Sequence, residues 1–455
     1  MIIDIADQGK AVGKADDAVV FVQGLVPGDI ANVKVIRKRK NYMEGILIDL
    51  IRESDSRNQP FCQHFGVCGG CKWQNLSYDK QLYFKQKQVA DNLQRIGQVE
   101  IPEIEPVIGS KKQQYYRNKL EYTFSNTRWL SDAEVRSENQ FSDRRALGFH
   151  IAGKFDRILD IETCYLQNDL SNLIRNEVRA FTLSNNYSYY DQRQNQGLLR
   201  NLIIRNTEYG EWMVMLVFQY NEKNLIEKLL KHIESKFPEL TSLLYVINPK
   251  VNDTIHDLDV LFFSGRDFVY EKLDDLKFKI GPKSFFQTNT FQALELYRKA
   301  LHFAELKGTE IVYDLYTGAG TIANFVASHC KKVIGLDYIE EAIQDANVNS
   351  ELNGITNTGF FTGDIKDLLN EDFIKQNGMP DVIITDPPRA GMHNDVVQSI
   401  LNIQPGRIVY ISCNPATQSR DIKLLSIKYK LTAIQPVDMF PHTHHVENIV
   451  RLDLK

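Results

Sequence analysis

The stretch IVYDLYTGAGT, residues 311–321, joins a short apolar run to a turn with two closely spaced glycines. Further short apolar runs follow it, with segments of helical character between them: KVIGLD (332–337), DVIITD (381–386) and RIVYIS (407–412). Buried strands that alternate with helices are typical of a doubly wound, mostly parallel sheet. The pattern therefore predicts an α/β, Rossmann-like domain over residues 291–455.

Gly318 and Gly320 lie where the first predicted strand turns into a helix. Glycines at such a turn let the backbone approach a ligand closely. Asp337 ends the second predicted strand, where an acidic residue commonly hydrogen-bonds a ribose diol. Because the full GxGxxG pattern is missing, the spacing suits a nucleoside without a pyrophosphate, such as S-adenosylmethionine. The alternative is that these glycines serve packing only.

The segment TDPPRAG, residues 385–391, ends a strand on the side of the sheet where open α/β folds bind ligands. Its two prolines fix the backbone and remove donors, so Asp386 is expected in a rigid turn that faces the ligand crevice. Methyltransferases of this fold use an acid-Pro-Pro-aromatic turn to accept the amino group of a base. Here Arg389 replaces the aromatic residue, which weakens that interpretation. The alternative is a structural proline turn.

Cys413 closes the last of these strands at the same predicted edge, in the segment YISCNPATQSRD (410–421). Asn414 is a good N-cap and Pro415 a good first helical residue, so a helix N-terminus is expected beside the thiol. That placement predicts a lowered thiol pKa and a cysteine nucleophile. The alternative is a buried structural cysteine, which is our interpretation of Cys330.

A nucleophilic thiolate suits methylation of an unreactive carbon such as C5 of uracil. Addition of the thiolate to C6 makes C5 nucleophilic, and a base must later remove the C5 proton. Glu447, in PHTHHVENIV (441–450), precedes the final apolar strand and is the candidate base. The three histidines of this segment are interpreted as loop residues that shape the site; metal binding is the less favoured alternative.

The N-terminal residues 1–53 contain short strand patterns around a Pro-Gly-Asp turn and predict a small, OB-like β-barrel. A basic run follows one of these strands and suits contact with an RNA backbone; the alternative is a solvated edge strand. This run consists of Lys34, Arg37, Lys38, Arg39 and Lys40.

Residues 54–290 predict an α+β central domain with a mostly antiparallel sheet. A helix is expected over 77–96, and strands over 119–124, 145–150, 199–206, 211–220 and 241–247. The segment KKQQYYRNK (111–119) interleaves cations with aromatic side chains, which suits single-stranded or looped RNA, although an ordinary surface loop is the alternative. Its candidate RNA contacts are Tyr115, Tyr116, Arg117 and Lys119.

The central domain also holds Cys62, Cys68, Cys71 and Cys164. Four thiolates suit either tetrahedral zinc or a four-iron cluster, and the spacing leaves both open. Six cysteines in 455 residues are too few for a disulfide framework, and no segment predicts a signal peptide or a membrane span, so a cytoplasmic protein without membrane contact is expected. The net charge of −4 argues against nucleic-acid binding over the whole surface.

Five motifs, taken together and in this order, resemble those of the RNA (uracil-5)-methyltransferases, the RumA/TrmA family. The motifs are FFQTN (285–289), DLYTGAGT (314–321), DPPRAG (386–391), CNPATQSRD (413–421) and PHTHHVE (441–447). The resemblance covers nearly the whole chain, including a TRAM-type barrel at the N-terminus. Two departures are Asp337 in GLD, where GVE is more usual, and Thr317, where many members have cysteine.

The resemblance implies that Cys413 is the nucleophile and Glu447 the proton acceptor. It further implies that Gln287, Tyr316, Asp337 and Asp386 line the methyl-donor and uracil sites. It assigns a [4Fe-4S] cluster to the four central cysteines, with zinc as the alternative, and it makes 23S ribosomal RNA the expected substrate. Separately, we expect a monomer. The competing hypotheses are a tRNA uracil-5 methyltransferase, an amino-group methyltransferase that uses the DPPR turn, and a non-catalytic RNA-binding module.

Overall fold

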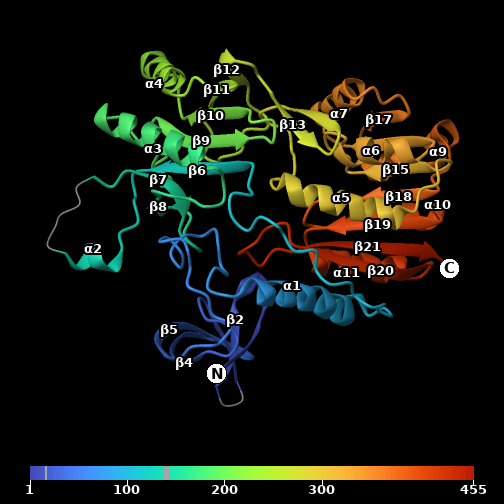
Figure 1. Ribbon diagram of the computed structural model, residues 1–455, viewed down its shortest axis with the longest axis horizontal. Coiled ribbons are helices and arrows are strands. Elements are labelled where there is room, and N and C mark those ends of the chain that lie inside the picture. Colours follow the sequence, from blue (N-terminus) through green and yellow to red (C-terminus); the bar gives the residue numbers. More distant parts are fainter. Residues whose placement is uncertain (16–17, 138–142) are drawn as a thin grey trace.

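The computed structural model describes residues 1–15, 18–137 and 143–455. Its strands form three main sheets and one separate hairpin, β13 (Val269–Leu273) with β14 (Leu276–Ile280). The N-terminal sheet lies at one end of the molecule, the central sheet at another, and the C-terminal sheet forms the third body (Figure 1). Within the described ranges, no helix is both long enough and apolar enough to cross a membrane. Localisation in the cytoplasm stays a prediction.

The C-terminal sheet has seven strands in the order β17-β16-β15-β18-β19-β21-β20. The first five strands of this order pair in parallel, and β21 pairs antiparallel with both of its neighbours. This arrangement confirms the predicted Rossmann-like domain. The strands are β15 (Ile311–Leu315), β16 (Lys332–Asp337), β17 (Thr358–Thr362), β18 (Val382–Thr385), β19 (Arg407–Ser412), β20 (Tyr429–Val437) and β21 (Glu447–Leu454).

Alternating side chains of these strands enter two different cores, as expected for a sheet covered on both faces. Val312 packs with α5 (Thr290–Ala304) and α6 (Thr321–Val326) on one face, and the next residue, Tyr313, packs with helices on the other face. The remaining helices of this domain are α7 (Glu340–Leu352), α8 (Ile365–Leu368), α9 (Glu371–Asn377), α10 (Asn394–Ile403) and α11 (Pro415–Leu425).

The central sheet is mostly antiparallel, with the strand order β12-β11-β10-β9-β6-β7-β8. The five strands expected from the sequence are present. The strands are β6 (Lys119–Ser125), β7 (Ala146–His150), β8 (Ile158–Asp160), β9 (Leu199–Asn206), β10 (Trp212–Phe218), β11 (Ser242–Ile247) and β12 (Val260–Gly265). The helices α3 (Asp169–Ser184) and α4 (Lys223–Lys236) cover one face, and α2 (Asp132–Arg136) lies in the excursion between β6 and β7.

The N-terminal sheet has five strands in the order β1-β2-β3-β5-β4. They are β1 (Ile2–Ile5), β2 (Ala11–Ala15), β3 (Ala18–Val22), β4 (Ile30–Lys38) and β5 (Tyr42–Arg52). Backbone hydrogen bonds from Ile2 N to Asp29 O (2.8 Å) and from Gly28 N to Ile2 O (2.9 Å) connect the edge strand β1 to the turn before β4. The sheet therefore curls back toward itself around a small apolar core.

The predicted helix near residues 77–96 is α1 (Tyr78–Asn92), which continues as a π-helical segment, Leu93–Gly97. It does not pack on the central sheet: Val89 and Leu93 belong to the same apolar cluster as Ile422 and Leu425 of α11. Figure 1 shows α1 between the N-terminal sheet and the layer of β20, β21 and α11. A segment from the first quarter of the chain thus supports the C-terminal domain.

Candidate active site

Cys413 is half-buried and follows the last residue of β19 directly. The Asn414 side chain caps α11 by accepting a hydrogen bond from Ala416 N (3.1 Å), and Pro415 is the first residue of the helix. The local structure predicted for this segment is therefore confirmed. Cys330, in contrast, is buried in the apolar core, as expected.

Glu447 lies opposite Cys413 because of the pairing between β19 and β21. Ser412 pairs with Asn448 in this antiparallel ladder, and continuing the register by one residue places Cys413 across from Glu447. Glu447 is 5% exposed. Among the described residues, none donates a hydrogen bond to its carboxylate. The thiol and the carboxylate thus lie near one another at one edge of the sheet, close enough for the Glu447 charge to raise the pKa of the thiol.

The DPPRAG turn is fixed against the N-terminal end of α11. The backbone carbonyl of Arg389 accepts hydrogen bonds from Asn414 Nδ2 and Thr417 Oγ1, both at 3.1 Å. Farther along the helix, Asp421 Oδ2 accepts from Met392 N (2.9 Å) and Arg420 Nη2 donates to Ala390 O (3.0 Å). These contacts explain the polar CNPATQSRD sequence, since its side chains hold the turn that carries Asp386.

The expected lowering of the Cys413 pKa is wrong. Burial, followed by the charges of Glu447 and Asp386, raises the pKa of the Cys413 thiol to about 11, and the Arg389 guanidinium beside it lowers the pKa only in part. The helix N-terminus predicted from the sequence is present, but the carboxylates come from β21 (Glu447) and from the turn after β18 (Asp386), and local sequence does not reveal that they lie near the thiol.

The two carboxyl groups also have raised pKa values. Burial and then the charge of Asp386 raise the pKa of Glu447 to about 8, with Arg389 opposing them, and burial raises the pKa of Asp386 to about 7. Both groups therefore change protonation state near neutral pH, as general acids and bases do. The arrangement can accept a proton from a thiol or from a carbon acid held between these residues.

The turn after β15 has left-handed backbone at Tyr316 (φ 64°), Gly318 (φ 55°) and Gly320 (φ 74°). A side chain at Gly320 would lie 2.9 Å from Ala346 Cβ, so packing requires this glycine. A Cβ at Gly318 would meet no atom within 4 Å, so the space beside it is open to a ligand. The positive φ of Tyr316 is a strained conformation of the kind found at functional sites.

Asp337 ends β16 as predicted and is buried. Its carboxylate accepts hydrogen bonds from Gly318 N (2.9 Å) and Ile339 N (3.0 Å). It therefore holds the glycine turn, and each oxygen keeps a second lone pair that a ribose hydroxyl could use.

Asp314, inside β15, is a residue that the sequence analysis missed. It is buried, and burial raises its pKa to about 7. Its Oδ2 accepts hydrogen bonds from Thr317 Oγ1 (2.6 Å) and Ala323 N (3.1 Å), whereas its Oδ1 has no partner among the described residues. A lone aspartate in the apolar run IVYDLY was the available signal, because such a group needs partners inside the fold.

Gln287 is buried in the loop before α5, and its backbone carbonyl accepts a hydrogen bond from Asn118 Nδ2 (2.9 Å). In the same loop, Asn289 caps α5 and donates from Nδ2 to Met439 O (2.9 Å). The FFQTN loop thus connects the end of the KKQQYYRNK segment with the chain that leads to Glu447.

The candidate RNA contacts differ in exposure. The basic residues of the N-terminal sheet are exposed on β4 and the turn after it: Lys34, Arg37, Lys38, Arg39 and Lys40. Arg37 forms an ion pair with Glu44 (3.7 Å). Within KKQQYYRNK, Tyr115 is 40% exposed, and Arg117 and Lys119 are half-buried.

The prediction that Tyr116 stacks on RNA is wrong for this conformation, because Tyr116 is only 3% exposed. Its ring packs in the core of the central domain, and its hydroxyl donates to Pro441 O (3.1 Å). The backbone is left-handed at Tyr115 (φ 54°), and at this bend Tyr115 is exposed and Tyr116 buried, which the composition of the segment could not show.

The four central cysteines lie in one region. Cys68 and Cys71 pack against the apolar cluster that contains Cys164, and neighbouring thiols, after burial, contribute to raising the pKa of Cys71 to about 12. All four are free thiols. Among the described residues, however, no three His, Cys, Asp or Glu side chains lie close enough together to hold a metal ion. Four cysteine thiols are a suitable set of donors for a four-thiolate site, but in this structure they are not brought together as ligands. Metal binding therefore stays a prediction.

Comparison with known proteins shows the family of this chain. The family model of tRNA (uracil-5-)-methyltransferases matches residues 253–455, and the TRAM domain model matches residues 2–48. A Bacteroides thetaiotaomicron protein described as an uncharacterized RNA methyltransferase is 56% identical, over 99% of this chain and 100% of its own length. A Porphyromonas gingivalis protein with the same description is 52% identical, over 99% of this chain and 98% of its own.

A solved structure that is similar to this chain covers nearly all of it. It is the crystal structure of Pyrococcus abyssi tRNA (uracil-54, C5)-methyltransferase in complex with S-adenosyl-L-homocysteine, with 29% identity, a TM-score of 0.78 and coverage of 99% of both chains. The fold and these similarities identify the chain as an S-adenosylmethionine-dependent RNA methyltransferase. The chain belongs to the RNA (uracil-5)-methyltransferases, the RumA/TrmA-like family, and carries the TRAM domain at its N-terminus.

Proposed function

We propose that this enzyme methylates C5 of a uridine through a covalent bond between Cys413 and C6 of the base. The thiol passes its proton to the neighbouring Asp386 carboxylate, and the thiolate adds to C6. The resulting enolate attacks the methyl group of S-adenosylmethionine from C5, and S-adenosylhomocysteine leaves. Glu447 then takes the C5 proton, the C6–sulfur bond breaks, and the thiolate recovers its proton.

The observation that carries this proposal is the register of β19 and β21, which sets Cys413 opposite Glu447. A nucleophile and a base that meet across one uracil ring are what the two-step reaction requires. An amino-group methyltransferase using Asp386 needs no thiol, and a non-catalytic module needs neither group. Because the base must enter between these side chains, the target uridine is unpaired or flipped out of its helix.

We propose that S-adenosylmethionine binds at the turn after β15. In this proposal Gly318, Gly320 and Asp337 line the nucleoside part, and Tyr316 and Gln287 border the path from the cofactor to the uracil. Support comes from the open space beside Gly318 and from the buried Asp337 carboxylate that holds Gly318 N.

For the substrate we propose 23S ribosomal RNA, held by the exposed cations of β4 and by Tyr115, Arg117 and Lys119. Transfer RNA is the second candidate, because the Pyrococcus abyssi tRNA enzyme matches 99% of this chain. The test is to map 5-methyluridine in ribosomal and transfer RNA from cells with and without the gene. Loss of the mark only from 23S RNA supports the proposal, and loss only from tRNA replaces it with the second candidate.

We further propose that Cys62, Cys68, Cys71 and Cys164 hold a [4Fe-4S] cluster, with zinc as the alternative. Four cysteine thiolates complete the coordination of either group. We expect anaerobically purified protein to be brown and to contain about four iron and four sulfide per chain. Cys71→Ser should lose most of this iron, whereas Cys330→Ser, which changes a thiol outside the region, should keep it. Zinc in place of iron would support the alternative. Protein that contains neither metal would contradict the proposal.

The pH dependence of turnover should reflect the protonation state of Glu447. A protonated carboxyl group cannot accept the C5 proton, and the pKa of Glu447 is raised to about 8. We therefore expect the single-turnover rate, with RNA and cofactor saturating, to rise with pH up to about 8 and then to level off. The rate of the Glu447→Asp variant should also rise with pH, but with its midpoint at a different pH. A rate that is flat or falls between pH 6 and 8 would contradict this assignment.

A further inference from the structure

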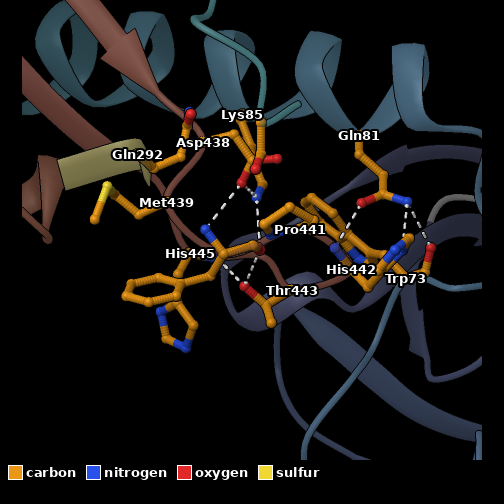
Figure 2. A network of polar contacts seen from close by, with 12 residues as sticks. Trp73, Gln81, Lys85, Gln292, Asp438, Met439, Pro441, His442, Thr443 and His445 are labelled. Atoms are coloured by element: carbon orange, nitrogen blue, oxygen red, sulfur yellow. Dashed lines mark hydrogen bonds and ion pairs between the residues drawn. The ribbon is translucent and has the colours of Figure 1, made fainter. Parts of the chain in front are cut away.

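The chain that connects β20 to β21, residues 438–446, is anchored at its start by a buried ion pair with α1. Lys85 of α1 and Asp438 are both 0% exposed, and the Lys85 ammonium donates to the Asp438 carboxylate (Figure 2). The same ammonium donates to Phe440 O (3.1 Å). Burying two charges is costly unless they are paired and hydrogen-bonded, so this contact is specific.

Further groups complete the shell around Asp438. Tyr78 OH donates to Asp438 Oδ2 (2.8 Å), and Phe440 N donates to Asp438 Oδ1 (3.1 Å). The Tyr78 hydroxyl in turn accepts from Ser110 N (2.6 Å). Asp438 therefore fixes the direction in which the chain leaves β20.

A second anchor holds the middle of the connection. The Gln81 amide accepts from His442 N (2.9 Å) and donates to Trp73 O (2.9 Å) and Leu76 O (2.8 Å). Lys72 N and Trp73 N donate to His442 O at 2.8 and 3.0 Å, directly after Cys71. Figure 2 shows Gln81 and Lys85 projecting from one helix toward the same connection.

These anchors bear on Glu447 because its carboxylate receives no hydrogen bond from the described residues. Its position is set by the backbone on its two sides, the strand β21 and the connection 438–446. Val437, the residue before Asp438, is the strand partner of Glu447. The ion pair thus lies one residue from the position that faces Glu447.

We propose that Lys85 is a positioning residue for the proton-removal step: by holding Asp438 and Phe440 O, it keeps the connection 438–446 in the conformation that aims Glu447 at the uracil. This inference rests on the proposed function. Lys85 contacts the connection 438–446 and not the junction of β19 and α11 where Cys413 lies, so formation of the covalent bond does not depend on Lys85. Only the later removal of the C5 proton does.

The test compares Lys85→Met with the double variant Lys85→Met/Asp438→Asn. The single variant leaves an unpaired buried carboxylate and is expected to lower the melting temperature. The double variant removes that charge, and its melting temperature should return toward that of the unaltered enzyme. A misplacement of a catalytic group by about 1 Å can cost roughly 100-fold in rate, so we expect the double variant to turn over roughly 100-fold more slowly.

Two further measurements distinguish a misplaced Glu447 from a general loss of activity. The double variant should form the covalent adduct with 5-fluorouridine RNA at the unaltered rate, and with ordinary RNA the adduct should accumulate. Lys87→Met serves as the matched control, because Lys87 lies on the same helix and forms partly exposed ion pairs with Asp4 (3.0 Å) and Asp91 (2.7 Å). It should change turnover by less than about twofold, as surface pairs contribute little.

Full turnover in the stable double variant would overturn the inference, and so would a slow turnover matched by equally slow adduct formation. The proposed function is tested separately by Glu447→Gln in the same assay. If Glu447→Gln accumulates the adduct and the double variant does not, the inference about Lys85 fails alone. If Glu447→Gln forms no adduct, the proposed function fails.

Discussion

Replacing Cys413 with alanine should abolish methyl transfer, with a fall in turnover of roughly 10⁴-fold or more, as for enzymes that lose their nucleophile. The reason is that C5 of uracil is scarcely nucleophilic until a thiolate has added to C6. RNA binding and S-adenosylmethionine binding should change little, because Cys413 is a small, half-buried side chain. The measurement is transfer of the labelled methyl group to total RNA, with filter binding in parallel.

The matched control for Cys413→Ala is Cys330→Ala. Cys330 is buried in the core of the same domain, so its loss should lower thermal stability and leave the rate per folded molecule nearly unchanged. Methyl transfer by Cys413→Ala at more than about one hundredth of the original rate would rule out the covalent route. It would favour the amino-group hypothesis, in which Asp386 suffices.

Replacing Glu447 with glutamine should stop the reaction one step later. Glutamine has nearly the same shape but cannot accept a proton, so the methylated adduct cannot eliminate the cysteine. We expect turnover to fall by roughly 10²-fold to 10⁴-fold, the usual contribution of a general base. A protein–RNA band that survives denaturing electrophoresis should accumulate with ordinary uridine RNA.

The order of the two steps makes these predictions complementary. Cys413→Ala should give neither product nor adduct, whereas Glu447→Gln should give adduct without product. A variant that combines Cys413→Ala with Glu447→Gln should behave like Cys413→Ala. An adduct in the absence of Cys413, or rapid product formation by Glu447→Gln, would place the chemistry on other residues.

The parallel sheet could be predicted because its strands are short apolar runs, each buried on both faces. The start of α11 could be predicted because Asn414 and Pro415 act locally. The strand β17, TGFFT, was missed, since its glycine and two threonines obscure the apolar pattern. Local sequence patterns therefore predicted the parallel sheet of the C-terminal domain, but not every one of its strands.

The chemistry of the site depends on contacts that local sequence does not contain. The raised pKa of Cys413 comes from burial and from the carboxylates of Glu447 on β21 and Asp386 in the turn after β18, with Arg389 opposing them. The partner of Asp438 is Lys85, 353 residues away in the chain, and no spacing rule connects the two. Tyr116 looked like an RNA contact in a basic segment, yet its position relative to the central core turned it inward.

The most direct test of the account is a trapping experiment with RNA that contains 5-fluorouridine, incubated with the enzyme and S-adenosylmethionine. Fluorine at C5 cannot leave as a proton, so the adduct should persist. We predict a stable protein–RNA complex whose digestion yields a modified peptide with the nucleotide on Cys413. Methylation of ordinary RNA without any such complex, or a nucleotide attached elsewhere, would contradict the proposed mechanism.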